Sequence, residues 1–550
     1  MTRILTVPGL LAAMIISLPA PAAQTPVDKA PLVKAPAGSL QGEAVDGVHV
    51  FKGIPYAQPP VGALRWKPPL PASKWKDTRV ATQFGAACIQ PKGRPESIYF
   101  WSLPKTSEDC LYLNVWTPAS ATKAPVFVWI HGGALSGGSS SEPFYDGRRM
   151  AEKGIVVVTI NYRMGPLGFL VHPALSAESR RNISGNYGLL DQILALEWVQ
   201  KNIAAFGGDP ANVTIAGESA GGLSVMYLMA APGARGLFHK AVLQSSYMVS
   251  AQELRTAGHD AYSGEAIGVW LQGKLGAGDL AGLRSMDAQQ VTDVAAANGF
   301  FPFFVIDGRI LPRQVVDVFD RGEQAKVPVL AGFNQGEIRS LRVLAPPVPA
   351  DAAAYEKEIR ERYKELADPF LKLYPASNLQ ESIWATTRDS LYGWTAERLA
   401  IKQTAAGVPA FLYLFDHGYP AADEKGMHAF HASEIPYMFG NADRAPLNWP
   451  KVPDTPAEAG LSKAMLDYWT SFARDGVPSA ADQPKWPAYG SERAYMAFED
   501  VPRPKLHLMP GMYEFNEQVV CRRRAAGGIP WHWNVGLASP PLPPPEAQCK

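Results

Sequence analysis

A serine lies between two glycines at the point where the sequence changes from a strand-like to a helix-like pattern. The apolar run Val213–Ala216 leads into Gly217–Gly221, with the sequence GESAG, and small or apolar residues follow to Met229. In this strand–turn–helix setting the glycines allow a sharp turn, so that the Ser219 side chain projects from the backbone. The start of the following helix adds unpaired N–H groups and the positive end of its dipole. A serine in this position predicts nucleophilic attack on a carbonyl group.

A glycine-rich segment follows an earlier apolar run in the same way. Trp129–Ala134 has the sequence WIHGGA and stands at the end of the run Val126–Ile130. Attack on a carbonyl needs hydrogen-bond donors for the developing oxyanion, and backbone N–H groups on a loop of small residues supply them. An ordinary glycine-rich turn would have the same sequence. Because a nucleophile turn lies downstream, we favour an oxyanion-binding loop.

The elements that must hold these two loops alternate along the chain. The spacing of apolar residues predicts helices over Asp191–Ala205 and Asp351–Leu366. Short apolar runs without polar alternation lie between helical stretches, as expected for strands covered on both faces. The predicted strands are Leu111–Trp116, Val126–Ile130, Ile155–Ile160, Val213–Ala216, Ala241–Leu243, Val327–Ala331 and Phe411–Phe415. This alternation predicts an α/β fold with a doubly wound sheet.

The composition suits one large globular unit. The chain has 550 residues, of which 47% are hydrophobic and 19% charged, and this excludes wholesale disorder. Because 52 Lys and Arg residues balance 51 Asp and Glu residues, the chain has no overall basic field to bind nucleic acid. No internal repeat or long linker divides the sequence. We therefore expect a single domain with large insertions over residues 23–550, and we leave its oligomeric state open.

The first 22 residues have the pattern of an export signal. Arg3 is followed by an apolar stretch from Val7 to Leu18 and then by the sequence APA at 20–22. A basic start, an apolar stretch too short to span a bilayer and an A-x-A end are typical of a cleaved signal peptide. An uncleaved anchor helix is the alternative. No other stretch has the roughly 20 apolar residues of a membrane helix, so we expect an exported protein, periplasmic or secreted, that does not enter the membrane.

The cysteines of the chain are Cys88, Cys110, Cys521 and Cys549. An oxidising compartment predicts two disulfides, and four cysteines allow three pairings. Sequence proximity favours Cys88–Cys110 and Cys521–Cys549, with free buried thiols as the alternative. The second pair would anchor a C-terminal tail whose Trp531 and Trp533 could then pack against the body. None of the cysteines belongs to a C-x-x-C pair, which argues against a structural zinc site.

Together these motifs resemble those of the type-B carboxylesterases, a family of the α/β-hydrolase fold that includes the cholinesterases. The resemblance covers nearly all of the chain after residue 22. Further family-like segments are Gly53–Ala57 with Arg65-Trp66, Glu108–Asn114, Asn161–Arg163, Gly185–Gly188 and Phe206–Pro210. The resemblance implies a large, mostly parallel central sheet with helices on both faces and helical insertions. It also implies hydrolysis of a small-molecule carboxylic ester through an acyl-enzyme intermediate, with neither a metal nor an organic cofactor.

The family order of nucleophile, acid and base selects the remaining catalytic candidates. The segment GFNQGE at 332–337 closes a predicted strand and resembles the family's acid loop, which makes Glu337 the candidate acid. Among the histidines after Ser219, only His431 precedes a sequence, ASEIP, similar to the family's histidine loop. His428 is the alternative base, and His428 with His431 could also form a metal pair, although no third ligand is evident. In the favoured scheme His431 takes the serine proton and passes it to the leaving alcohol, while Glu337 orients the imidazole.

The resemblance also assigns supporting groups. It places the oxyanion donors at the backbone N–H groups of Gly133, Ala134 and Ala220. Cholinesterases have glycine in place of Ala134, and a backbone donor tolerates this change. Glu218 is expected to be buried near the histidine, with a solvent-facing turn acid as the alternative. Ser245 resembles a serine that supports the catalytic groups from behind, and a plain hydroxyl at the edge of the core is equally compatible with its position.

Aromatic residues are the candidates for a substrate pocket. Trp101 lies between Cys88 and Cys110, where cholinesterases have a tryptophan that holds the choline cation. Because the spacing differs by one residue, an apolar wall is the favoured role. Phe300 and Phe301 precede a segment where the family shapes its acyl pocket. Phenylalanine also occupies positions 303 and 304, and two of the four would belong to the core because alternate strand residues face opposite ways.

Three functions fit these residues. A secreted serine carboxylesterase is favoured because Ser219, Glu337 and His431 are all present. A non-catalytic binding module on the same fold would typically lack the serine or the histidine. An amidase or another acyl hydrolase would use the same three groups on a different leaving group.

Overall fold

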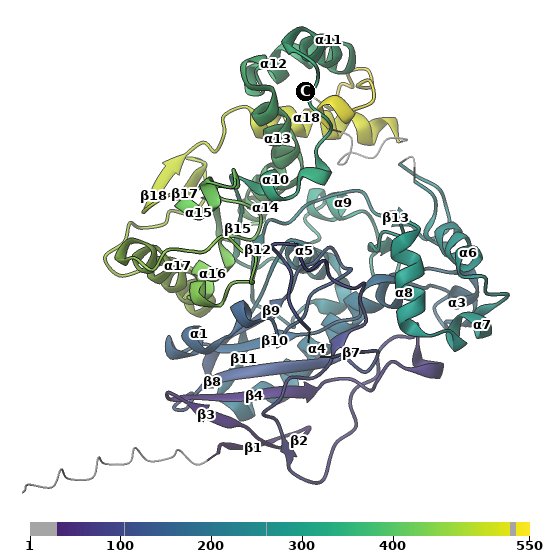
Figure 1. Ribbon diagram of the computed structural model, residues 1–550, viewed down its shortest axis with the longest axis vertical. Helices are drawn as coiled ribbons and strands as arrows, with labels where there is room; N and C mark the ends of the chain where they lie inside the picture. The colour runs from purple at the N-terminus through teal and green to yellow at the C-terminus, as the bar shows by residue number, and fades with distance from the viewer. Residues whose placement is uncertain (1–29, 104, 260, 528–534, 550) are drawn as a thin grey trace, which may run out of the picture.

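A mixed β-sheet runs through the molecule and carries the loops of the candidate site. The computed structural model describes residues 30–103, 105–259, 261–527 and 535–549. The sheet strands are β3 (Glu43–Val45), β4 (Val48–Pro55), β8 (Tyr112–Pro118), β9 (Ala124–Ile130), β10 (Val156–Ile160), β11 (Gly208–Glu218), β12 (Lys240–Gln244), β15 (Val329–Asn334), β16 (Ala410–Phe415), β17 (Ala494–Phe498) and β18 (Pro502–Leu506). Their order is β18-β17-β16-β15-β12-β11-β9-β10-β8-β4-β3 (Figure 1).

The sheet is mostly parallel, as the sequence predicts. All neighbours between β17 and β10 in this order are parallel, and antiparallel pairs occur only toward the two ends of the described sheet. Every predicted strand is present. The strands β3, β4, β17 and β18 were not predicted. Strand β18 lies at the edge of the sheet and is largely exposed, and an edge strand tolerates its two prolines, Pro502 and Pro504.

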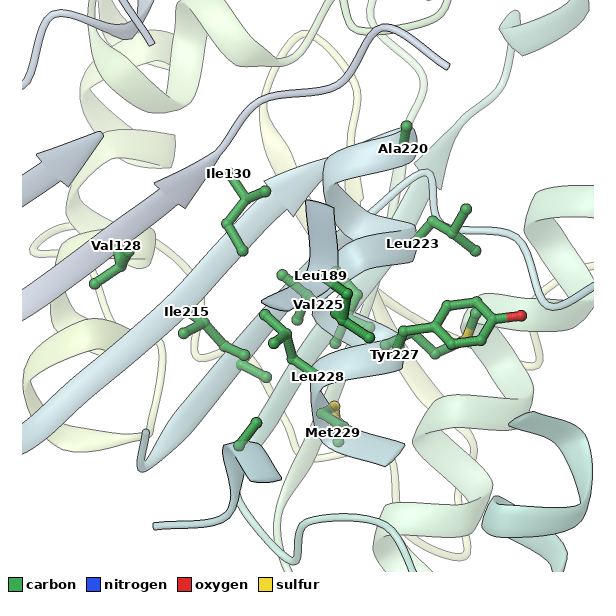
Figure 2. Close-up of a cluster of buried hydrophobic side chains, with 14 of the residues drawn as sticks. Val128, Ile130, Leu189, Ile215, Ala220, Leu223, Val225, Tyr227, Leu228 and Met229 are labelled. Carbon is green, nitrogen blue, oxygen red and sulfur yellow. The ribbon is translucent and has the colours of Figure 1, made fainter. Parts of the chain in front are cut away.

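Both faces of the parallel part are buried, so that successive side chains of one strand belong to different cores. On β9, Val126, Val128 and Ile130 pack in one cluster, whereas Phe127 and Trp129 pack in another. The helices of the first cluster include α4 (Tyr187–Asn202), α5 (Ala220–Ala230) and α14 (Trp394–Ala405), and those of the second include α1 (Arg148–Glu152), α16 (Ile435–Phe439) and α17 (Pro456–Asp475). Figure 2 shows sheet side chains of the first cluster together with those of α5. Burial on both sides explains why these strands lack polar alternation.

Both predicted helices are present with shifted ends. The first begins earlier than predicted, at Tyr187, and its last predicted turn is a separate 3₁₀ turn at Ile203–Phe206. The second is α11 (Ala352–Tyr363), at whose start Asp351 accepts a hydrogen bond from the backbone N–H of Ala354 at 2.8 Å. A short polar side chain at this position satisfies an N–H group that the helix itself leaves unpaired.

A lobe of helices lies at one end of the molecule, together with the C-terminal tail (Figure 1). It contains α11, α12 (Ala367–Leu373), α13 (Leu379–Arg388) and α18 (Met512–Ala526). Leu537 and Leu542 of the tail pack in its core, and a disulfide joins Cys521 of α18 to Cys549. Trp531 and Trp533 lie outside the described residues.

The other disulfide, Cys88–Cys110, closes a loop in the N-terminal part of the chain. Its ends are also joined by the short strands β6 (Ala87–Cys88) and β7 (Thr106–Ser107). Both pairs are those favoured by sequence proximity. The expected signal segment, residues 1–22, lies outside the described residues. Within the residues that the structure describes, no helix has both the length and the apolar character of a membrane span.

Candidate active site

Ser219 occupies a strained turn between β11 and α5. Its φ of 56° and ψ of −122° are unfavourable for a residue with a side chain. Its N–H donates to Gln244 O at 2.9 Å, and its C=O accepts from Leu223 N at 2.8 Å. A Cβ on Gly221 would lie 2.0 Å from Ile130 O, so only glycine lets the helix approach the end of β9 this closely. The strain is therefore maintained by backbone contacts to the neighbouring strands.

The glycine-rich loop at residues 131–139, here called the oxyanion loop, lies beside this serine. A Cβ on Gly132 would be 3.2 Å from Ser219 Cβ. Gly133 and Ala134 have φ values of 102° and 55°, and both residues are exposed. In the described part of the chain, no hydrogen bond is donated by the backbone N–H of Gly133, Ala134 or Ala220. These N–H groups are therefore free to receive an oxygen atom that carries negative charge.

His431 and Glu337 are joined directly. His431 Nδ1 hydrogen-bonds Glu337 Oε2, and the carboxylate is fully buried at the start of α10 (Glu337–Ser340). Its second oxygen, Oε1, accepts from Ser245 Oγ at 2.7 Å and from Asn334 N at 2.8 Å. Ser245 was predicted as a supporting group, and in the structure its hydroxyl contacts Glu337. The bond to this carboxylate favours a proton on Nδ1, and Nε2 is the ring nitrogen that faces Glu218.

Glu218 lies on the other side of the imidazole. Its Oε1 is 3.1 Å from His431 Nε2, and burial raises the pKa of this carboxyl well above its usual range. Burial alone would lower the pKa of His431, but the charges of Glu218 and Glu337 outweigh burial and raise this pKa to about 9. Glu218 and His431 therefore titrate as a coupled pair. Among the described residues no hydrogen bond joins Ser219 Oγ to His431 Nε2, and a contact of this kind often closes only in the substrate complex.

A third buried carboxylate near Glu218 and His431, that of Glu434, was not predicted from the sequence. Glu434 Oε1 accepts from Gln244 Nε2 at 2.8 Å, and Oε2 accepts from Asn334 Nδ2 at 2.6 Å. Burial, and then the charge of Glu337, raise the pKa of Glu434 to about 7. Because Asn334 also donates to Glu337, one side chain and its backbone hold both acids in place. No local sequence pattern marks such a contact between distant segments.

His428 is held away from the other catalytic candidates. Its Nε2 lies 3.0 Å from Asp416 Oδ1 and its Nδ1 lies 3.0 Å from Asp423 Oδ1, so that both ring nitrogens have carboxylate partners. The hydrogen bond to Asp416 is the main cause that raises the pKa of His428. In the described ranges, no group of three or more His, Cys, Asp or Glu side chains could hold a metal ion.

The aromatic candidates are spread over different parts of the fold. Trp101 stacks on Phe144 with ring centroids 5.5 Å apart. Phe300 packs against a cluster that includes Trp66 and Leu167, and Phe301 is 50% exposed.

The remaining two phenylalanines differ in burial, since Phe304 is buried and Phe303 is only partly buried. Phe304 is fully buried and stacks on Tyr227 with centroids 4.1 Å apart, and Phe303 packs on Phe304. The rings that do lie against His431 are Tyr99, at 6.5 Å, and Tyr392, at 5.6 Å between centroids. Tyr99 belongs to the same disulfide-closed loop as Trp101 but was not predicted, and Tyr392 lies in a π-helical turn, Asp389–Gly393, that has no sequence signature.

A family model described as "Carboxylesterase family" matches residues 29–515. The chain belongs to the carboxylesterase family. One relative is "Fumonisin B1 esterase" of Sphingopyxis macrogoltabida, which is 37% identical over 84% of this chain and 85% of the relative. Another is "Para-nitrobenzyl esterase" of Bacillus subtilis, which is 38% identical over 83% of this chain and 92% of the relative. A solved structure of "PNB esterase" superposes with a TM-score of 0.76 at 33% identity, covering 88% of this chain and 99% of that one. The fold is accordingly the α/β-hydrolase fold, and the protein is a carboxylic ester hydrolase.

Proposed function

We propose that Ser219, His431 and Glu337 form a catalytic triad that hydrolyses carboxylic esters through an acyl-enzyme intermediate. His431 Nε2 accepts the Oγ proton as Ser219 attacks the ester carbonyl carbon. The resulting oxyanion is stabilised by the N–H groups of the oxyanion loop and of Ala220. His431 then protonates the alkoxide as its bond to the acyl carbon breaks, and the alcohol leaves. Water attacks the acyl-enzyme by the same route and frees the serine.

The bond between His431 Nδ1 and the buried Glu337 is the observation that carries this proposal. It stabilises the imidazolium that forms in each step and keeps Nε2 directed toward the proton that moves. The strained φ of Ser219 and the free N–H groups of Gly133 and Ala134 support the other two roles. A non-catalytic binding module would have no need of either feature.

The deciding experiment uses p-nitrophenyl acetate and an organophosphate such as diethyl p-nitrophenyl phosphate. Ser219→Ala should lower kcat by a factor on the order of 10⁴ or more, because the nucleophile is removed. The organophosphate should label the native chain once, at Ser219, and should not label Ser219→Ala. If Ser219→Ala keeps a tenth of the native turnover, the assignment of Ser219 as the nucleophile is wrong. Comparing p-nitrophenyl acetate with the corresponding anilide separates an esterase from an amidase.

We also propose that the protein is exported, to the periplasm or the medium, and that residues 23–550 act as one domain. The sequence pattern of residues 1–22 and the two disulfides support export. Mass determination of the protein from the periplasmic fraction tests it. A mature chain that begins near residue 23 is expected, and a full-length chain in the cytoplasmic fraction would contradict export.

A further inference from the structure

The loop closed by Cys88 and Cys110, here called the disulfide loop, contacts both halves of the proposed active site. Near its start, Gln90 Oε1 accepts from Gly138 N at 3.0 Å, and Gln90 Nε2 donates to Gly138 O at 3.0 Å. This pair of bonds ties the loop to the oxyanion loop. Further along, Tyr99 Oη donates to His431 O at 3.0 Å. One segment thus connects the oxyanion donors with the catalytic base.

The backbone of His431 is held by side chains. It lies in a turn before α16, and the following residue, Ala432, has a φ of 68°. His431 N donates to Ser340 Oγ at 3.3 Å, and its C=O accepts from Tyr99 Oη. Among the described residues these are the only hydrogen bonds to the two backbone groups. His431 itself lies outside the helices and strands that the structure describes, although the preceding residue, Phe430, forms a β-bridge with Gly336.

The two side chains also bond to each other, at 2.8 Å between Tyr99 Oη and Ser340 Oγ. Tyr99 Oη thus donates to Ser340 Oγ and to His431 O, and Ser340 Oγ also accepts from His431 N, so that the three residues form a closed ring of hydrogen-bond contacts. The aromatic side chain of Tyr99 also makes edge-to-face contacts with His431 and Trp449, at 6.5 Å and 5.8 Å between ring centroids.

We propose that Tyr99 is a positioning residue for the reaction, which it serves by fixing the backbone of His431 through this ring of hydrogen bonds. This inference rests on the proposed role of His431 as the base. Glu337 fixes the imidazole at Nδ1, and Tyr99 with Ser340 fixes the Cα from which the imidazole extends. Both are needed to direct Nε2 at the serine proton, since a displacement of about 1 Å in such a site costs about 100-fold in rate.

The test is Tyr99→Phe, which removes one oxygen atom and keeps the ring. It should lower kcat for p-nitrophenyl acetate by about 10- to 100-fold while KM stays within about two-fold, because the base is misplaced and the substrate contacts remain. Ser340→Ala should lower kcat to a similar extent. The double variant should have a kcat no lower than that of the slower single variant, since both changes break the same ring of hydrogen bonds. Ser340→Thr, which keeps the hydroxyl, should recover much of the rate.

A matched control is Tyr355→Phe. It removes a hydroxyl that donates to a backbone carbonyl, Tyr374 O, at 2.9 Å, but in the helical lobe. It should leave kcat unchanged. All rates are divided by the number of sites that the organophosphate titrates, so that loss of folded protein is not counted as loss of rate.

The outcomes separate this proposal from the proposed function. If Tyr99→Phe keeps native kcat per titrated site while His431→Ala is inactive, the positioning role is wrong and the triad stands. If Tyr99→Phe lowers only the number of titrated sites or the midpoint of thermal unfolding, Tyr99 is merely structural and the proposal is likewise overturned. If His431→Ala itself remains active, the triad assignment has failed.

Discussion

The serine and the histidine of the proposed triad are held by different means. Ser219 is fixed by backbone hydrogen bonds and by glycines that let β11, α5 and β9 approach one another. His431 lies in a turn and is fixed by side chains that come from distant segments, at Tyr99, Glu337 and Ser340. The first arrangement tolerates no added Cβ atom, whereas the second depends on individual hydroxyl and carboxyl groups. Mutations should therefore damage the two sides in different ways.

On the histidine side, the largest effect is expected from His431→Ala. Loss of the base should lower kcat by a factor on the order of 10⁴ with little loss of stability, because the polar ring around the backbone of residue 431 can remain. Steady-state kinetics and thermal unfolding check the two parts. His428→Ala is the control, since the imidazole of His428 hydrogen-bonds Asp416 and Asp423 and its loss should change kcat by about two-fold at most. A greater loss from His428→Ala would mean that the base has been misassigned.

On the serine side, Gly221→Ala should damage activity and stability together. The new Cβ would lie 2.0 Å from Ile130 O, and a clash with backbone is relieved only by moving α5 away from β9. We expect a stability loss of about 1–3 kcal/mol or more and a rate loss of about 100-fold, because Ser219 and the N–H of Ala220 move with the helix.

Gly273→Ala provides the comparison for this change. Gly273 lies in α6 (Gly264–Leu275), and a Cβ there would meet no atom within 4 Å. It should be stabilising by up to about 1 kcal/mol, as alanine favours helix over glycine. Chemical denaturation of both variants decides the matter. Equal stabilities for the two would show that the close contact at Gly221 has no role.

A smaller effect is expected from Glu218→Gln, which changes the pH dependence of the histidine side. The charge of Glu218 helps to raise the pKa of His431 to about 9, and the base is active only when neutral. Removing that charge lowers this pKa, so the acid limb of the kcat/KM profile should move to lower pH, by about one unit or more. Glu434→Gln should move it less, because the charge of Glu434 acts more weakly on His431 than those of Glu218 and Glu337. A shift to higher pH would contradict this account.

The same contrast explains what the sequence could predict. The turn at Ser219, the oxyanion loop and the buried strands follow from short runs of glycine and apolar residues, since close backbone approach and burial leave a local pattern. Glu337 and His431 were assigned through family-like segments, not from geometry. Tyr99, Tyr392 and Glu434 reach the site through contacts between residues far apart in the sequence, and such contacts leave no local pattern. For this reason Trp101 was singled out in the disulfide loop, although Tyr99 is the residue whose ring lies against His431.

The two disulfides provide the last and mildest comparison. Cys521–Cys549 closes a 28-residue separation and joins the tail to α18 in the helical lobe, whereas the Cys88–Cys110 loop carries Gln90 and Tyr99 to the site. The double variant Cys521→Ser/Cys549→Ser should lose about 3–4 kcal/mol of stability and keep its kcat per titrated site. In Cys88→Ser/Cys110→Ser, kcat per titrated site should fall as well, because the unclosed loop holds His431 less firmly. Denaturation midpoints and titrated rates for both pairs test this difference. If the tail variant loses kcat as much as the loop variant does, the disulfides act on the fold as a whole and the loop has no special link to the site.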